Sequence, residues 1–115
     1  MRGATTCDED SKVEVDTKTQ RLVEEMLERN AIAHDDLVSI IFTATDDITT
    51  EFPATAARAL GLGDVPLLCA RELGIAHGKP LTIRVMMHFY GEQPRSELHH
   101  VYLEGAPSLR DDLPA

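Results

Sequence analysis

Hydrophobic residues recur every three or four positions between residues 12 and 30, which is the spacing of one face of an α-helix. The stripe consists of apolar residues and one threonine: Val15, Thr19, Leu22, Val23, Met26 and Leu27. Just before it, Ser11 is followed three positions later by Glu14, the pattern of a capping box at a helix start. We therefore predict an amphipathic helix from Ser11 to about Asn30.

A second pattern, alternation with a period of two, extends from Leu81 to Tyr90 and predicts one long strand. One face of this strand would carry Leu81, Ile83, Val85, Met87 and Phe89. The other face would carry Thr82, Arg84, Met86, His88 and Tyr90. The segment Leu37–Thr45 is instead apolar on both faces. Its apolar residues include Val38, Ile40, Ile41 and Phe42. Such a run predicts a buried strand at the centre of a sheet.

Shorter elements complete the predicted domain. Strands are expected over a short segment at the start of the chain, over Val65–Cys69 and over His100–Ala106. Pro53 suits the first turn of a second helix, which continues to Leu60 and stops at Gly61. We expect one α+β domain over residues 1–115, with a mixed β-sheet covered by helices on one face. The other face would be poorly covered in a monomer, so we expect association through the sheet.

Composition narrows the classes of partner. The net charge of −9 argues against binding to a nucleic-acid backbone. Eight of the eleven positive residues are arginines, and several adjoin apolar strands, which suits a local anion pocket. No stretch approaches the length of a membrane span, and no signal-like apolar run follows Met1. Cys7 and Cys69 are isolated thiols without the spacing of a disulfide framework or a zinc site. A cytoplasmic protein is expected.

Arg84 is the most informative single residue. A guanidinium in mid-strand, flanked on its own face by Thr82 and Met86, is expensive to bury without an anion. Arginine is also well shaped to grip a carboxylate or an ether oxygen through two parallel N–H donors. The alternative is a solvent-facing residue on a half-exposed sheet, and the segment alone does not decide between the two.

Five blocks that occur in one order along the chain are more specific than any single residue. They are Arg2–Thr6, Phe52–Arg58, Val65–Glu72, Ile83–Met87 and His100–Glu104. Together they closely resemble the AroH-type chorismate mutases, the small monofunctional trimeric class, and the likeness spans nearly the whole chain. The resemblance implies a homotrimer around a barrel-like β core, with three active sites in clefts between subunits.

The activity that the resemblance implies is the intramolecular Claisen rearrangement of chorismate to prephenate, in the biosynthesis of phenylalanine and tyrosine. Such a reaction requires no metal and no cofactor, and none is expected. By the matching blocks, Arg84 would lie against the ether oxygen of the breaking bond and one carboxylate. Arg2 and Tyr102 would hold a carboxylate, and Glu72 with Cys69 would meet the ring hydroxyl.

The resemblance also implies the surroundings of the substrate. The apolar wall would consist of Phe52, Ala54 and Leu67, with Arg58 and Arg110 near the mouth. Thr55, Leu68 and Leu109 complete the expected substrate-binding set. Thr55 stands where a lysine can appear in the family and Leu68 where a threonine can, so the pocket would lack one cation and one hydroxyl.

Another class of function stays open on the residues alone. A non-catalytic trimeric module that binds a small carboxylate metabolite would use Arg2, Arg84 and Tyr102 equally well. Glu72 and Cys69 favour the enzyme, because a generic carboxylate binder would not need a receptor for a ring hydroxyl. Each residue also has an ordinary structural explanation, such as a core cysteine or a solvated glutamate in a turn.

Overall fold

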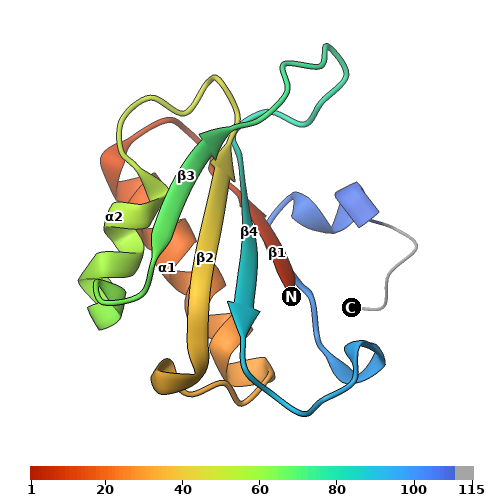
Figure 1. Ribbon diagram of the computed structural model, residues 1–115. Coiled ribbons are helices and arrows are strands. Elements are labelled where there is room, and N and C mark those ends of the chain that lie inside the picture. The colour runs from red at the N-terminus through yellow and green to blue at the C-terminus, as the bar shows by residue number, and fades with distance from the viewer. Residues whose placement is uncertain (111–115) are drawn as a thin grey trace.

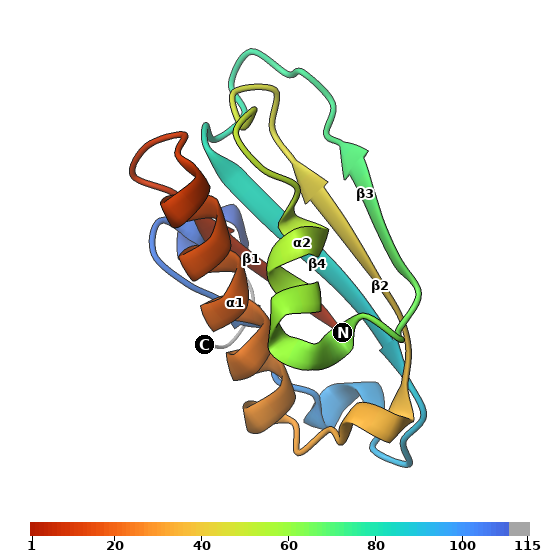
Figure 2. The ribbon, with the colours of Figure 1, turned by 90° about the vertical axis from the view of Figure 1, so that its left-hand side faces the viewer.

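The computed structural model describes residues 1–110 as a five-stranded mixed sheet with two α-helices on one of its faces (Figures 1 and 2). The elements are β1 (Arg2–Thr6), α1 (Lys12–Arg29), β2 (Leu37–Ala44), α2 (Pro53–Ala57), β3 (Leu67–Arg71), β4 (Thr82–Phe89) and β5 (Val101–Tyr102). Short 3₁₀ turns span His34–Asp36, Arg95–Glu97 and Ala106–Arg110, and a π turn spans Arg58–Leu62. The predicted α+β architecture is confirmed.

The strands lie in the order β3-β2-β4-β1-β5. β4 is antiparallel to both β2 and β1, whereas β2 is parallel to β3 and β1 is parallel to β5. The first strand of the chain therefore lies inside the sheet, between two strands from the second half of the sequence (Figure 1).

The core lies between the sheet and the helices. The predicted stripe of α1 is buried against β1, β5 and α2, with Leu27 partly buried at its edge. The buried residues of the two strands alternate as expected: Ile40 and Phe42 in β2, and Ile83, Val85 and Met87 in β4. At Gly3 the helix approaches so closely that a Cβ atom would lie 2.5 Å from the Met26 sulfur, so any side chain there would have to displace the Met26 side chain.

Both helix starts follow the sequence. The Ser11 side chain accepts a hydrogen bond from the Glu14 backbone N–H at 3.2 Å, as an N-cap should. The Glu14 carboxylate, however, accepts from the Asp8 N–H at 2.7 Å, so it caps the preceding loop rather than Ser11. Pro53 occupies the first turn of α2, and Gly61 ends the helical segment in the left-handed region at φ 88°.

Three strand predictions need correction. β2 is buried on one face only: Ile41 is only half-buried because no helix covers that side, and Val38, 38% exposed, lies at a shift in the register with β4. β3 begins at Leu67 rather than Val65, since the Val65 N–H closes a turn onto Leu62 and Pro66 has no N–H to donate. β5 has only two residues, because the chain enters the left-handed region at Glu104, where φ is 53°.

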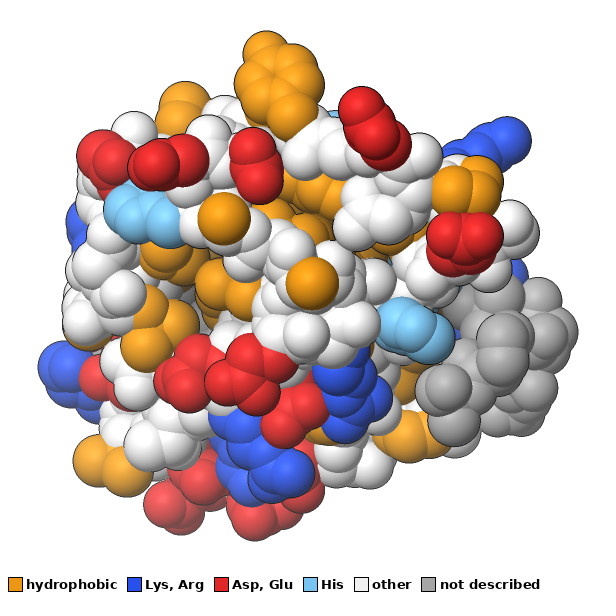
Figure 3. Space-filling model, turned by 90° about the horizontal axis from the view of Figure 1, so that it is seen from below, with side chains coloured by type: hydrophobic (Ala, Val, Ile, Leu, Met, Phe, Trp, Pro, Cys, Tyr) orange, Lys and Arg blue, Asp and Glu red, His pale blue; other side chains and the backbone are white. Residues whose placement is uncertain are grey.

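The second face of the sheet carries no helix among the described residues, as the sequence predicts (Figure 2). Exposed Leu68 and Met86 lie on it. At the lower end of the molecule, acidic side chains are scattered over the surface with hydrophobic atoms between them (Figure 3). Within residues 1–110, no helix has the length and apolar character needed to cross a membrane.

Candidate active site

Arg84 lies on the open face of the sheet, at the centre of three strands. Its neighbours across the ladders are Ala4 on β1 and Thr43 on β2. Both are small, so the guanidinium lies over them rather than being pushed into solvent. The side chain is 49% exposed and points away from the helix-covered core. The sequence-based placement of Arg84 on the polar face of its strand is therefore confirmed.

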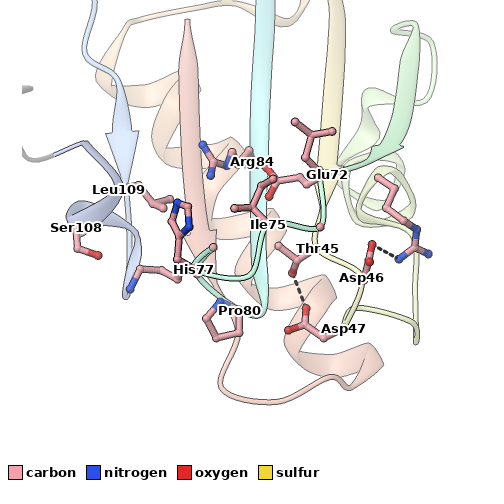
Figure 4. Close-up of a pocket in the computed structure, with 15 residues that line it drawn as sticks. Thr45, Asp46, Asp47, Glu72, Ile75, His77, Pro80, Arg84, Ser108 and Leu109 are labelled. Carbon is pink, nitrogen blue, oxygen red and sulfur yellow. Dashed lines mark hydrogen bonds and ion pairs between the residues drawn. The ribbon is translucent and has the colours of Figure 1, made fainter.

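Glu72 meets Arg84 from the end of β3. Its backbone N–H donates to the Ala44 carbonyl at 3.0 Å, which continues the strand pairing by one residue. Its Oε1 lies 2.6 Å from Arg84 Nε and also accepts from the Thr43 hydroxyl at 2.9 Å. The Glu72 side chain is only 15% exposed. Figure 4 shows Arg84 and Glu72 side by side, between the loop that bears Ile75 and His77 and the segment that bears Leu109.

A pocket of about 300 Å³ surrounds this pair, and we call it the arginine pocket. The sequence-predicted residues that line it are Arg2, Glu72, Arg84, Tyr102 and Arg110. Three guanidinium groups and one carboxylate give it a net charge of +2 inside a chain of net charge −9. This local positive charge favours the binding of an anion over that of a cation.

Arg2 is held in place by β5. Its backbone N–H donates to His100 Nδ1 at 3.0 Å, a contact between residues 98 positions apart. Burial lowers the pKa of His100, and the nearby Arg2 charge lowers that pKa further. The neutral imidazole that results is the form able to accept this hydrogen bond. Tyr102 pairs with Ala4 in the parallel ladder, which places it on the same face as Arg84.

A second pocket of about 430 Å³ lies at the start of α2 and is here called the Phe52 pocket. Phe52 and Cys69 line it, together with the segment from Ile48 to Glu51. Phe52 is 67% exposed, which is unusual for a phenylalanine in a chain with only three. The segment is anchored by Asp10, whose carboxylate accepts from the backbone N–H and the hydroxyl of both Thr49 and Thr50.

The single chain does not bring Cys69 and Glu72 into one pocket, although the family resemblance implies that both contact the same ring hydroxyl. Cys69 is in register with Phe42, so its side chain points to the helix-covered side and packs against the core. Glu72 turns to the open face. The predicted site is thus divided into two groups of residues, one in the arginine pocket and one in the Phe52 pocket.

The remaining predicted residues are spread around these two pockets. Leu109 lines a larger depression of about 870 Å³ that adjoins the arginine pocket and shares Arg84 and Glu72 with it. Ala54 is 6% exposed and Leu67 packs against the core, so both are largely covered by their own chain. Arg58 donates to the Thr55 hydroxyl at 2.9 Å on the exposed side of α2. Leu68 is exposed on the open face of β3.

Thr43 is the site residue that sequence reasoning missed. It lines the arginine pocket and contacts Glu72 directly. The strand Leu37–Thr45 was recognised, but its pairing register with the strand of Arg84 cannot be read from a single sequence. Without that register, a threonine in a β-rich run has no distinguishing signal.

Comparison with known proteins identifies the family of this chain. The sequence model of the family described as chorismate mutase type I matches residues 1–113. The chain is 42% identical to chorismate mutase AroH of Thermus thermophilus over 98% of this chain and 93% of that protein. It is 40% identical to chorismate mutase AroH of Bacillus subtilis (strain 168), over 98% of this chain and 90% of that protein.

A solved structure gives the same result for the fold. The chorismate mutase from Clostridium thermocellum superposes with a TM-score of 0.92 at 41% sequence identity, covering 94% of this chain and 96% of that chain. The five-stranded sheet with helices on one face is thus a fold shared with a solved member of an enzyme class, the chorismate mutases. This chain belongs to the chorismate mutase type I family.

Proposed function

We propose that this protein is a chorismate mutase that converts chorismate to prephenate in an active site built around the arginine pocket. The observation that carries the proposal is the group of Arg2, Arg84 and Arg110 in one pocket of an otherwise acidic chain. Chorismate bears two carboxylates, and the net charge of +2 in the pocket complements them. Membership of the chorismate mutase type I family supports the choice of this dianion over any other.

The reaction is an intramolecular rearrangement in which an ether C–O bond breaks while a C–C bond forms between two parts of the same molecule. No proton changes place and no covalent bond to the protein is needed. The protein contributes by holding the substrate in a compact reactive shape and by stabilising charge. The ether oxygen becomes more negative as its bond breaks, and a guanidinium aimed at it lowers the barrier.

Each residue of the arginine pocket has a role in this scheme. Arg84 donates hydrogen bonds to the ether oxygen and to one carboxylate of the substrate, and Arg2 with Tyr102 binds a carboxylate. Glu72 accepts a hydrogen bond from the ring hydroxyl. The Glu72 contact to Arg84 Nε leaves the terminal nitrogens of that guanidinium for the substrate. Arg110 adds positive charge at the mouth of the pocket.

We further propose that the site is completed by a second subunit of a homotrimer. Two observations support this: the expected substrate-binding residues fall into two separate pockets of one chain, and the open sheet face exposes apolar Leu68 and Met86. In the proposed assembly, the Phe52 pocket of one subunit, with Phe52, Ala54, Leu67 and Cys69 nearby, faces the arginine pocket of the next. Thr55, Arg58 and Leu68 lie beside that apolar wall, and Leu109 lies beside Arg84.

The activity is tested by following the ultraviolet absorbance of chorismate in the presence of purified protein. We expect the absorbance to fall and prephenate to form, and we expect the Arg84→Ala variant to be inactive while folded. Wild-type protein that binds chorismate tightly but leaves it unchanged would instead identify the non-catalytic binding module.

The shared site is tested by mixing two inactive variants. Arg84→Ala removes the catalytic charge, and Phe52→Glu places a negative charge on the exposed ring position of the opposite wall. Phe52 is preferred to buried Ala54, because a larger side chain at Ala54 would also disturb the core. After co-refolding at equal amounts, about one quarter of the sites should combine an intact Arg84 with an intact Phe52 from its neighbour. Confirmed heterotrimers that remain inactive would show that both walls belong to one chain.

A further inference from the structure

Thr43 occupies a fixed position beside the Glu72–Arg84 pair. It lies on the open face of β2, directly opposite Arg84 in the antiparallel ladder. Its hydroxyl donates to Glu72 Oε1 at 2.9 Å. Because threonine is stiff at χ1 and its backbone is paired on both sides by β3 and β4, this donor has little freedom to move.

Thr43 and Arg84 bind the same oxygen of the carboxylate. Glu72 Oε1 receives the Thr43 hydroxyl at 2.9 Å and lies 2.6 Å from Arg84 Nε. Two donors at one oxygen fill the lone pairs that point toward the sheet. The other oxygen, Oε2, has no hydrogen-bond partner among residues 1–110, while Glu72 lines both the arginine pocket and the larger depression beside it.

We propose that Thr43 is a positioning residue for the rearrangement: its hydroxyl fixes the Glu72 carboxylate so that Oε2 is presented to the hydroxyl group of the bound substrate. This inference rests on the proposed function, because it assigns to Glu72 a substrate hydroxyl as its ligand. A single contact from Arg84 to Oε1 leaves the carboxylate able to pivot about that oxygen. The second donor approaches the same oxygen from β2 and restricts that pivot.

The structural argument also explains why a hydroxyl is needed at residue 43. A valine would have the same shape and the same preference for a strand, but it could not donate. Glu72 would then keep its contact to Arg84 and lose its orientation. A serine would keep the donor and lose only a methyl group.

The test compares Thr43→Val with Thr43→Ser in the chorismate assay. We expect Thr43→Val to lower kcat/KM about tenfold, the scale of one hydrogen bond to a charged group, and Thr43→Ser to recover most of that loss. Ser39→Ala is the matched control, because Ser39 lies on the same face of β2 and its hydroxyl contacts His88 instead of the site. That control should keep wild-type kcat/KM. Thr43→Ala removes the hydroxyl by a second route, should Thr43→Val unfold.

A double substitution separates positioning from a general effect on the strand. In a Glu72→Ala background, Thr43→Val should cause no further loss, since its only proposed role is to orient that carboxylate. An equal loss in both backgrounds, or a fully active Thr43→Val variant, would overturn the inference while leaving the chorismate mutase assignment intact. Wild-type protein without mutase activity would overturn the proposed function and the role of Thr43 with it.

Discussion

The two faces of the sheet differ in what their side chains contact: one packs against helices, and the other is open and lines the arginine pocket. Along β2 and β4, apolar residues under α1 and α2 alternate with residues of the open face. The apolar residues on the covered face are almost fully buried. The open face carries Arg84, Glu72, Thr43 and Tyr102, all of which contact polar partners or line a pocket. The same strands thus stabilise the fold through one set of side chains and, in the proposed function, bind substrate through the other.

This difference means that the effects of substitutions should separate by face. A residue on the covered face contributes through packing, so its loss should lower the free energy of unfolding. In the proposed function, a residue in the arginine pocket contributes through charge aimed at the substrate, so its loss should lower activity while the fold survives. A substitution that lowers both the free energy of unfolding and the activity would not distinguish the two faces.

The largest expected effect is on the covered face. Phe42→Ala should lower the free energy of unfolding by about 3–5 kcal/mol, because it leaves a cavity under α1 and α2. Denaturant unfolding measures this, and Tyr90→Ala is the control, since Tyr90 is an exposed aromatic just beyond β4. If both variants lose the same stability, the covered face is not the main packing interface of the fold.

On the open face, Arg84→Lys should reduce kcat by about 10²–10³-fold although the formal charge is kept. An ammonium cannot reproduce the planar contact of a guanidinium with Glu72 on one side and the ether oxygen on the other. Steady-state kinetics and the thermal unfolding midpoint are measured together, with Arg29→Lys on α1 as the matched substitution. A variant with normal kcat and a raised KM would show that Arg84 binds substrate without stabilising the transition state.

The smallest expected effect is on the pH dependence of stability, and it concerns Asp10, which anchors the segment before Phe52. Hydrogen bonds from Thr49 and Thr50 lower the pKa of Asp10 to about 2 from its ordinary 3.8. Since the folded-state pKa is depressed, the anchor stabilises the protein above about pH 4 and is lost as the pH falls toward 2. The difference in thermal midpoint between wild type and Asp10→Asn should therefore shrink over that range.

Asp8→Asn provides the control for this acid dependence. Its side chain has no hydrogen-bond partner among the described residues, so its difference from wild type should not change between pH 4 and 2 in the same way. An Asp10→Asn difference that stays constant from pH 7 to 2 would show that the carboxylate charge is not what holds the segment.

Periodicity predicted the covered face well, because burial against a helix leaves a direct mark on the sequence. The stripe of α1 and the alternation around Val85 follow from that single requirement. The open side of β2 was misjudged, since Ile41 is apolar although no helix covers it, and the register shift that leaves Val38 exposed has no signal in the sequence. The lengths of β3 and β5 depend on Pro66 and on the backbone at Glu104, and these local effects do not alter the hydrophobic pattern.

For the site, alternation placed Arg84 on the polar face of its strand without deciding its role, and the resemblance to a family supplied that role and the other residues. Geometry then sorted them, which no pattern could do: Glu72 lies against Arg84, whereas Cys69 faces the core two strands away. Thr43 depends on strand register and was not foreseen. Residues that act through shared contacts are therefore harder to find from sequence than residues that act through their own chemistry.

The place of β1 inside the sheet has a consequence for how the chain folds as it is synthesised. Arg2 pairs with Met86 and Gly3 with Val101, so the first strand to leave the ribosome has no partner until nearly the whole chain exists. At about 5–20 residues per second, that interval is on the order of 5–20 s. A nascent chain that ends before β4 can pair β2 with β3, but it leaves both edges of β1 open. The arginine pocket, which takes residues from β1, β4 and β5, can form only after that.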